Sequence, residues 1–410
     1  MTMPKRLLTS IKSHREHFSN GGFLAYSNLL TSITSFGTVY IFANFIPQET
    51  FGTYKYVLSI ASVLSIFTLQ GMNTAVAQSV SRGYENALKE GVRSKMLFGS
   101  IGTAIGLSIS AYYFFQGNTV LGSSFLVTAL AIPFFGTFNL YRSYLNGKKE
   151  YKTIARETTL YNLAFFVLFS GTLLLTNNIV LILLGYFLFS IFLQFFIYFK
   201  ISRKLSTTNK TNDPEIVRYG KHLSLMKGFT VATGSISTIA LWQILGPLAL
   251  PVYALALAPI EQVRPMLQLT ENLLLPNMAQ KSWRAHSITW FFKKTAIFLL
   301  AIVLFVIVYV VSAPLIYTVF FPNYMESVFL SQIFSISLLF TGINILLMTI
   351  MKSKKQIRNL YFSNGILIFF DLLTVPAIYF FGILGLIVNI LLGKALLTFV
   401  SLFLVFRKNS

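Results

Sequence analysis

Four basic side chains lie inside long apolar segments, where an ionised group is costly unless a partner or water stabilises it. They are Lys55, Lys227, Arg264 and Lys394. Because a charge at the centre of a membrane helix costs about 2.5–3.5 kcal/mol, four cations facing lipid would lose about 10–14 kcal/mol. We therefore expect each cation either to pair with an acid or to line a hydrated cavity that binds an anion. Lys55, close to the end of its segment, can also snorkel to the membrane surface.

Three acids accompany these cations in the second half of the chain: Glu261, Glu271 and Asp371. Glu261 and Arg264 are one helical turn apart and can form an ion pair in place, and Asp371 can pair with Lys394 across two neighbouring helices. The same acids are candidates for coupling to a proton or sodium gradient. A cation that neutralises an acid in only one conformation biases the equilibrium between conformations. The sequence leaves both interpretations open.

Uncharged polar residues follow one face of several apolar segments at spacings of three or four. Asn28 lies in the first such stripe, Ser59 and Ser62 in the second, and Gln268 on the same face as Arg264. Such stripes usually serve helix packing through close approach and interhelical hydrogen bonds. The functional alternative is that they line a hydrated passage.

Residues typical of catalysis or metal binding are sparse. Cysteine is absent, and we expect none of the four histidines to bind a metal. No Gly-rich phosphate loop with a lysine is present, so the chain contains no ATPase motor. The connections on the outer side are short for a membrane glycosyltransferase or ligase, which is the least favoured function class. We therefore expect no enzyme, no catalytic residue, no metal site and no cofactor beside the coupling gradient.

The composition predicts the kind of structural element that carries these charged and polar residues. Of 410 residues, 55% are hydrophobic and only 11% charged, against about 25% charged in ordinary globular domains. Apolar runs of about 20 residues, enough to cross a bilayer as a helix, recur along the whole chain. The sequence thus predicts an all-α polytopic membrane protein and excludes nucleic-acid-binding folds. The twelve expected transmembrane helices are 22–45, 53–80, 96–115, 120–141, 158–175, 179–199, 222–245, 252–278, 295–320, 327–350, 359–380 and 383–406.

The distribution of the basic residues behind the net charge of +21 predicts how the chain is oriented in the membrane. Twenty-nine of the 33 Lys and Arg residues lie before the first expected helix, in alternate connections and after the last helix, and the connections between these contain none. Short loops rich in Lys and Arg stay in the cytoplasm, so both termini are expected to be cytoplasmic. Anionic membrane lipids, not nucleic acid, are the expected partner of this basic side.

The longest polar connection divides the chain into two halves. It contains Asp213-Pro214, a turn signal, and the halves echo each other, with Pro47 before Tyr54 and Pro247 before Tyr253. This pattern predicts two pseudo-symmetric six-helix bundles with a substrate site between them. The expected segments are a cytoplasmic lead-in at 1–21, a first bundle at 22–199, a linker at 200–221, a second bundle at 222–406 and a cytoplasmic tail at 407–410.

Several short motifs resemble those of a known family. Residues 51–54 (FGTY), Gly71, Arg82, residues 253–256 (YALA) and residues 275–276 (LP) are similar to motifs of Wzx-type O-antigen flippases. These belong to the MOP (multidrug/oligosaccharidyl-lipid/polysaccharide) exporter superfamily. The resemblance implies two helix bundles that alternate between inward-open and outward-open states. It also implies a lipid-linked oligosaccharide substrate, carried on undecaprenyl pyrophosphate and flipped across the bacterial inner membrane for O-antigen or other surface polysaccharide, with polysaccharide polymerase and chain-length machinery as partners.

The resemblance also implies roles for the polar residues of the apolar segments. The cations would meet the pyrophosphate or acidic sugars in a cavity, and the prenyl tail would stay in lipid. Sugar hydroxyls would meet Asn28, Ser59, Ser62 and Gln268. The first bundle's spans contain no acid, unlike those of the superfamily's drug exporters, which favours an anionic substrate. Residues 253–256 lack the basic residue that lipid II flippases carry there. A cation-coupled multidrug or metabolite exporter of the same fold is the alternative.

Overall fold

The computed structural model describes residues 5–203, 213–280, 288–353 and 356–406. For 5–21, 24–25, 264–266, 268–280, 288–295, 353, 357, 360–361, 364 and 406 it describes the backbone alone. All regular structure in these ranges is helical, which confirms the predicted all-α class. The elements are α1 (Lys5–Phe45), α2 (Gln48–Leu64), η1 (Ser65–Thr68), α3 (Met72–Ser81), α4 (Ala87–Phe115), α5 (Thr119–Ala131), α6 (Leu140–Gly147), α7 (Tyr151–Leu175), α8 (Ile179–Ser202), α9 (Ile216–Leu245), α10 (Ala249–Gln280), α11 (Ile288–Phe320), η3 (Pro322–Tyr324), α12 (Glu326–Ser335), α13 (Ser337–Ser353) and α14 (Ile357–Phe406).

Within the described residues, eight helical stretches are long and apolar enough to cross a membrane. The last of them, Gly365–Val405, contains Gly382 with a non-helical backbone (φ 61°, ψ −146°), so α14 is two helices joined at a kink. Each of the twelve expected spans overlaps one or more of the helices. The chain is therefore a multi-pass membrane protein, while the count of twelve and the cytoplasmic termini stay predictions.

Three expected spans are interrupted, and the break in 327–350 is short, at Ile336 between α12 and α13. The other two breaks are longer. Residues 53–80 divide into α2, η1 and α3, because Leu69 adopts a left-handed backbone (φ 53°) at the end of η1. Residues 120–141 divide into α5 and α6, since Pro133 lacks an N–H for a helical hydrogen bond and Gly136 has a positive φ of 69°. Hydrophobicity continues through both breaks, which is why the sequence predicted single helices there.

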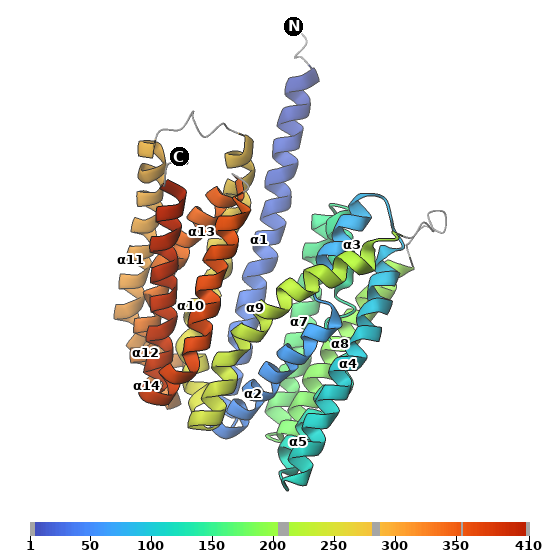
Figure 1. Cartoon of the computed structure of the whole chain (residues 1–410), viewed down its shortest axis with the longest axis vertical. Coiled ribbons are helices and arrows are strands. Elements are labelled where there is room, and N and C mark those ends of the chain that lie inside the picture. Colours follow the sequence, from blue (N-terminus) through green and yellow to red (C-terminus); the bar gives the residue numbers. More distant parts are fainter. Residues whose placement is uncertain (1–4, 204–212, 281–287, 354–355, 407–410) are drawn as a thin grey trace. The chain divides into compact units, whose positions relative to one another are not determined.

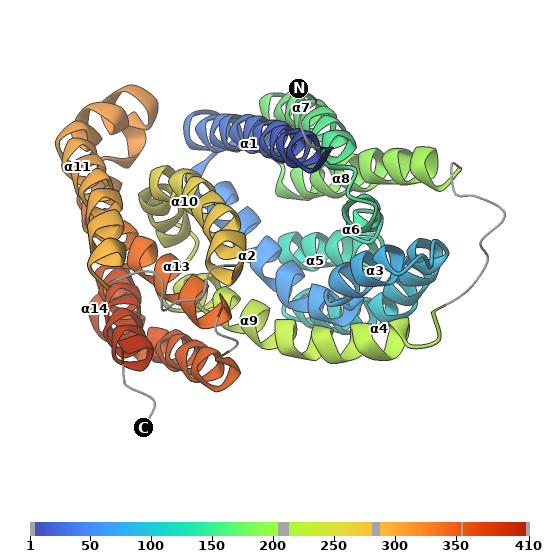
Figure 2. The ribbon, with the colours of Figure 1, turned by 90° about the horizontal axis from the view of Figure 1, so that it is seen from above.

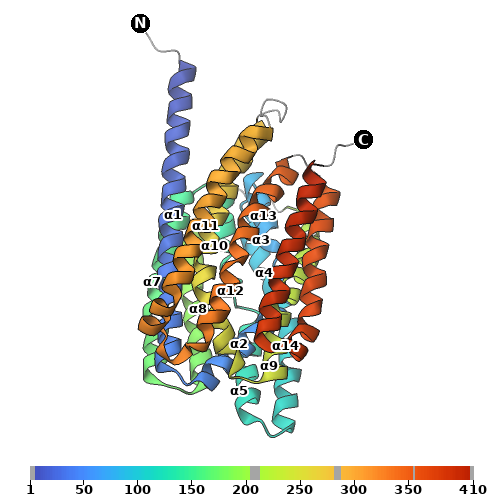
Figure 3. The ribbon, with the colours of Figure 1, turned by 90° about the vertical axis from the view of Figure 1, so that its left-hand side faces the viewer.

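The chain forms two compact units, and each is described by itself. Unit 1 contains Met1–Ile41 and Val57–Ala232, and unit 2 contains Phe42–Tyr56 and Thr233–Ser410. The units differ from the expected bundles in two segments: residues 42–56 belong to unit 2, and the first part of α9 belongs to unit 1. In unit 1, α4 packs along α5, and α3 packs against α4 and α6 (Figures 1 and 2). In unit 2, α13 packs along α14, and α10 against α12 and α13 (Figure 3).

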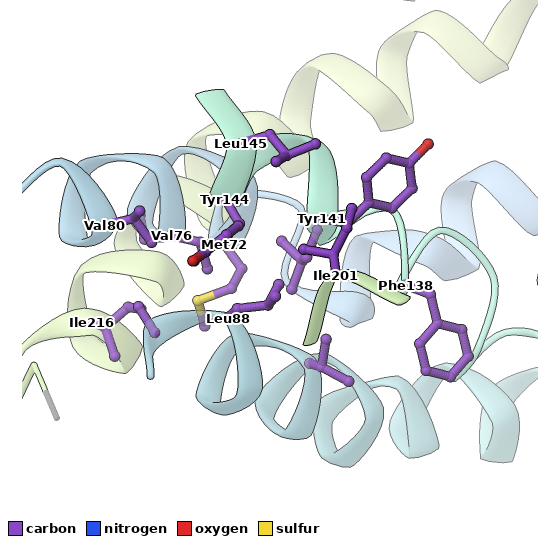
Figure 4. Close-up of a cluster of buried hydrophobic side chains, with 14 of the residues drawn as sticks. Met72, Val76, Val80, Leu88, Phe138, Tyr141, Tyr144, Leu145, Ile201 and Ile216 are labelled. Atoms are coloured by element: carbon purple, nitrogen blue, oxygen red, sulfur yellow. The ribbon is translucent and has the colours of Figure 1, made fainter. Parts of the chain in front are cut away.

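The core of unit 1 fixes α3 in place (Figure 4). Met72, Val76 and Val80 recur every four residues and form one buried stripe on α3. Leu88 of α4 and Tyr141 of α6, both almost fully buried, pack into the same cluster. This packing holds the first turn of α3 at a fixed position relative to α4.

Candidate functional site

Lys227 is the expected site residue that unit 1 places against other polar groups. It is exposed on α9, and its Nζ donates to the Thr74 hydroxyl at 3.2 Å. One turn earlier, the Ser224 hydroxyl accepts a hydrogen bond from the Gly71 backbone N–H at 2.9 Å. A Cβ on Gly71 would overlap the backbone of α9 at Leu223 and Ser224. Gly71 therefore allows the approach that brings Thr74 to Lys227.

Lys95 joins this group, and the sequence analysis missed it as a site residue. It lies on α4 and is only 3% exposed. Its Nζ donates to the Gly136 carbonyl at 3.2 Å and, more weakly, to Asn73 Oδ1 at 3.5 Å. The ammonium groups of Lys95 and Lys227 are close enough to repel each other. The expected span began at residue 96, one residue too late to include Lys95, whereas α4 begins at Ala87.

We call Asn73, Thr74, Lys95 and Lys227 the dilysine site. No carboxylate forms an ion pair with either lysine in the part of the chain that the structure describes. The site therefore presents two positive charges together with a hydroxyl and an amide. Hydrogen bonds from ionised donors to phosphate oxygens are among the strongest in proteins, so this arrangement is suited to an anion.

The other expected residues of the first half are placed separately. Lys55 belongs to unit 2, where its Nζ lies 5.6 Å from the centre of the Phe51 ring, so a cavity that it shares with Lys227 stays a prediction. Asn28, Ser59 and Ser62 belong to unit 1. Asn28 is exposed, Ser62 half-buried and Ser59 buried. Their expected role in binding sugar hydroxyls stays a prediction as well.

The expected charged residues of the second half lie in unit 2. Asp371 accepts a hydrogen bond from the Thr233 hydroxyl, and the charges of Asp371 and Glu261 both act on the buried Tyr253. Lys394 donates to Thr341 Oγ1 at 3.3 Å. The expected pairing of Asp371 with Lys394 stays a prediction.

Lys394 also lies 5.3 Å from the centre of the Phe334 ring. Arg264, Gln268 and Glu271 are on α10, but their side chains lie outside the described residues. Within the described part of the chain, no group of three or more His, Cys, Asp or Glu side chains suits a metal ion.

A second region, in unit 2, joins the α1–α2 turn to the α9–α10 turn. Tyr56 stacks on Trp242 with ring centroids 4.1 Å apart and an interplanar angle of 11°. Phe42 stacks on Phe51 at 4.8 Å and on Tyr54 at 4.5 Å. We call these five residues the aromatic seam. All of its rings are neutral.

Polar and backbone contacts complete the aromatic seam. The Gln243 amide donates to the Tyr56 hydroxyl at 2.9 Å, and the Gln48 amide donates to the Leu248 carbonyl at 3.0 Å. A Cβ on Gly52 would overlap the Pro247 carbonyl. The glycine of the FGTY motif is therefore required by the close approach of two backbones.

Comparison with known proteins gives the family and the fold. Residues 18–268 match the family described as polysaccharide biosynthesis protein. The fold is similar to that of the lipid II flippase MurJ in an inward closed conformation (TM-score 0.66, 14% identity, covering 95% of this chain and 87% of that chain). It is also similar to the eukaryotic MATE transporter AtDTX14 (TM-score 0.64, 12% identity, 96% of each chain).

A MOP superfamily transporter from Pyrococcus furiosus is a third similar structure (TM-score 0.58, 14% identity, 94% of each chain). No curated protein matches the sequence. At these identities the solved structures show a shared MOP-type transporter fold. Both the family and the fold are those of transporters and flippases rather than enzymes.

Proposed function

Because the chain belongs to the polysaccharide biosynthesis protein family, we propose that it flips a lipid-linked oligosaccharide across a bacterial inner membrane by alternating access. The substrate is an oligosaccharide repeat unit on undecaprenyl pyrophosphate, destined for O-antigen or another surface polysaccharide. The observation that supports this choice most is that Lys95 and Lys227, in helices of unit 1, form no ion pair with an acid among the described residues. Such cations favour an anionic substrate over a cationic drug.

Different residues would bind the different chemical groups of the substrate. Lys55, Lys227, Arg264 and Lys394 offer positive charge to the pyrophosphate in a partly hydrated space, where ionic hydrogen bonds are strong. Asn28, Ser59, Ser62 and Gln268 offer hydrogen bonds to sugar hydroxyls. The prenyl tail stays in the bilayer, so the protein does not have to enclose a long apolar chain.

Translocation requires no covalent step, and so the account assigns no catalytic residue, metal or cofactor. Glu261, Glu271 and Asp371 are the candidates for coupling to a proton or sodium gradient. An acid neutralised by a cation in one state only would shift the balance between inward-open and outward-open conformations by its differential affinity. Polysaccharide polymerase and chain-length machinery would take over the flipped product.

A second candidate is a cation-coupled multidrug or metabolite exporter of the same fold. The observation in its favour is the acidic environment of Tyr253 in unit 2, where the charges of Glu261 and Asp371 meet. A lipophilic cation would be stabilised by these carboxylates rather than by the lysines of unit 1.

Deletion of the gene in its host separates the two candidates. We expect loss of surface polysaccharide and accumulation of lipid-linked repeat units, with unchanged sensitivity to lipophilic cations. Lys55→Ala, Lys227→Ala and Arg264→Ala, tested singly, should each restore less polysaccharide than the exposed control Lys221→Ala at equal protein level. Normal export by all three variants would contradict the role of the cavity cations, and increased drug sensitivity with normal polysaccharide would favour the exporter.

A further inference from the structure

We propose that the dilysine site binds the diphosphate group of the substrate when it enters from the cytoplasmic leaflet. The inference rests on the proposed function and identifies the residues that recognise this group first. It adds Lys95, Asn73 and Thr74, none of which the sequence analysis marked as site residues. All four residues of the site belong to unit 1.

The two positive charges of the site call for a negative ligand. Two ammonium groups that repel each other, one of them on the almost fully buried Lys95, are unfavourable unless a negative group compensates them. The hydrogen bonds of Lys95 go to neutral oxygens, the Gly136 carbonyl and the Asn73 amide. An ammonium has three donors, so one N–H of Lys95 has no partner among the described residues.

The exposed groups of the site suit the oxygens of a phosphate. Lys227, Thr74 and Asn73 are all exposed, whereas Lys95 lies behind them. Lys227 and Thr74 can therefore touch a ligand directly. Lys95 acts as a positioning residue, because its ammonium donates to Asn73 Oδ1 and adds positive charge from the buried side of the site. Asn73 and Thr74 lie in the first turn of α3, where the helix dipole also favours negative charge.

Two charges at one place favour a diphosphate over a single phosphate. A monoanionic phospholipid head group needs only one of the lysines, while a prenyl diphosphate carries enough negative charge to compensate both. Because of this difference in negative charge, the site would bind the substrate in preference to the surrounding phospholipids, which are in large excess.

The depth of the site fits entry from the cytoplasmic side. At a rise of about 1.5 Å per residue, Lys95 lies about 12 Å from the first residue of α4 and Lys227 about 17 Å from that of α9. Both helices are expected to begin on the cytoplasmic side, by the distribution of basic residues. The diphosphate can thus reach the site while the prenyl tail remains in the inner leaflet.

A structural role for Lys95 makes different predictions. If its only task is to connect the turn at Gly136 to α3, replacing it should lower thermal stability, and Lys227 should not matter. A binding role instead requires that both lysines change affinity for the same ligand, with coupled effects.

The test measures binding to the purified full-length protein in nanodiscs. The probes are undecaprenyl diphosphate, undecaprenyl monophosphate and phosphatidylglycerol. The variants are Lys95→Met and Lys227→Met, which keep the apolar stem and remove the charge, with Lys227→Arg as the conservative exchange. Lys89→Met on α4 and Lys221→Met on α9 are matched controls, because both lysines are exposed and lie outside the site.

We expect each Met variant to weaken undecaprenyl diphosphate binding about tenfold. Phosphatidylglycerol binding should stay within about twofold, and the preference for diphosphate over monophosphate should fall. The controls and Lys227→Arg should bind like the wild type. A lower diphosphate preference at an unchanged melting temperature distinguishes the positioning role of Lys95 from a structural one. If Lys95→Met does not fold, diphosphate binding by Lys227→Met and Thr74→Val still tests the proposal, because substitutions at these exposed positions should not prevent folding.

Diphosphate affinity within about twofold of the wild type in folded Lys227→Met and Thr74→Val would overturn the proposal. A parallel loss of phosphatidylglycerol binding would also overturn it, because the site would then be a general head-group site. If the wild type flips lipid-linked oligosaccharide while the variants bind normally, the dilysine proposal alone fails. If the wild type neither binds undecaprenyl diphosphate nor flips the substrate, the proposed function fails too.

Discussion

The aromatic seam and the dilysine site are built on opposite physical principles, although α9 contributes to both. In the seam, neutral rings stack on one another and two glutamine amides donate to oxygen acceptors. In the dilysine site, two cations are held by neutral oxygens and have no acidic partner among the described residues. Each region depends on one glycine: Gly52 for the seam and Gly71 for the site.

The two regions therefore have different roles: we expect the aromatic seam to stabilise the fold and the dilysine site to bind the substrate. The contacts of the seam satisfy one another, so it needs no ligand. Among the described residues, no acid forms an ion pair with the lysines of the dilysine site, so we expect an anionic ligand to compensate their charge. Perturbing the seam should change stability, while perturbing the site should change binding and its dependence on salt.

The largest effect is expected from Gly52→Ala. The added Cβ would overlap the Pro247 carbonyl, a backbone atom that cannot move alone. We expect destabilisation of about 3 kcal/mol, the upper end of the range for overpacking, seen as a lower melting temperature in detergent. Gly234→Ala is the control in the same unit, because a Cβ there has no atom within 4 Å. Equal melting temperatures for the two variants would contradict the close approach.

Ser224→Ala tests the scaffold of the dilysine site. It removes the acceptor of the buried Gly71 N–H, and an unsatisfied buried donor costs about 1–3 kcal/mol. We expect about 1–2 kcal/mol of destabilisation together with weaker undecaprenyl diphosphate binding, because Thr74 loses its position beside Lys227. Ser100→Ala, exposed on α4, should change neither quantity. Destabilisation without any change in binding would separate the scaffold from the site.

Salt distinguishes the two regions directly. Raising the ionic strength from about 0.01 M to about 0.1 M shortens the Debye length from about 30 Å to about 10 Å. Binding of undecaprenyl diphosphate should weaken several-fold, because the exposed charge of Lys227 is screened. The melting-temperature difference between Gly52→Ala and the wild type should not change, since the overlap of the added Cβ with the Pro247 carbonyl is steric. A salt-independent affinity would argue against the ionic account of the site.

The smallest effect is expected within the seam itself, from a double-mutant cycle on Tyr56→Leu and Trp242→Leu. Stacked aromatic pairs contribute about 0.5–1.5 kcal/mol beyond the area they bury. We therefore expect a coupling energy of that size in thermal unfolding, with no effect of the Trp242→Leu single variant on diphosphate affinity. Additive effects of the two substitutions would show that the stack contributes nothing of its own.

The features that depend on local composition could be predicted from the sequence. The apolar runs predicted the helices, and the cost of a buried charge singled out Lys227. Lys95 was missed because hydropathy marks where a helix becomes apolar, whereas α4 begins nine residues before the expected span, at Ala87. Hydrogen bonding extends the helix through its polar first turns, and these turns bring Lys95 into the site.

Features that depend on long-range packing could not be predicted in this way. The assignment of Lys55 to unit 2 follows from the contact between Gly52 and Pro247, nearly 200 residues apart in the sequence. The breaks after Leu64 and Ala131 occur inside continuous apolar sequence, where one left-handed residue, Leu69, and one proline, Pro133, decide the direction of the chain. The sequence contains the FGTY motif, but only the structure explains its glycine: Gly52 leaves space for the Pro247 carbonyl.

Reconstitution into liposomes tests the central claim most directly. Purified protein is incorporated with a fluorescent undecaprenyl-pyrophosphate oligosaccharide, and the fraction that becomes accessible to a membrane-impermeant quencher is followed over time. The account predicts faster exchange of this lipid between leaflets than in protein-free liposomes, with a marked loss for Lys227→Met and none for Lys221→Met. Exchange no faster than in protein-free liposomes, together with uptake of a lipophilic cation by the same preparation, would contradict it.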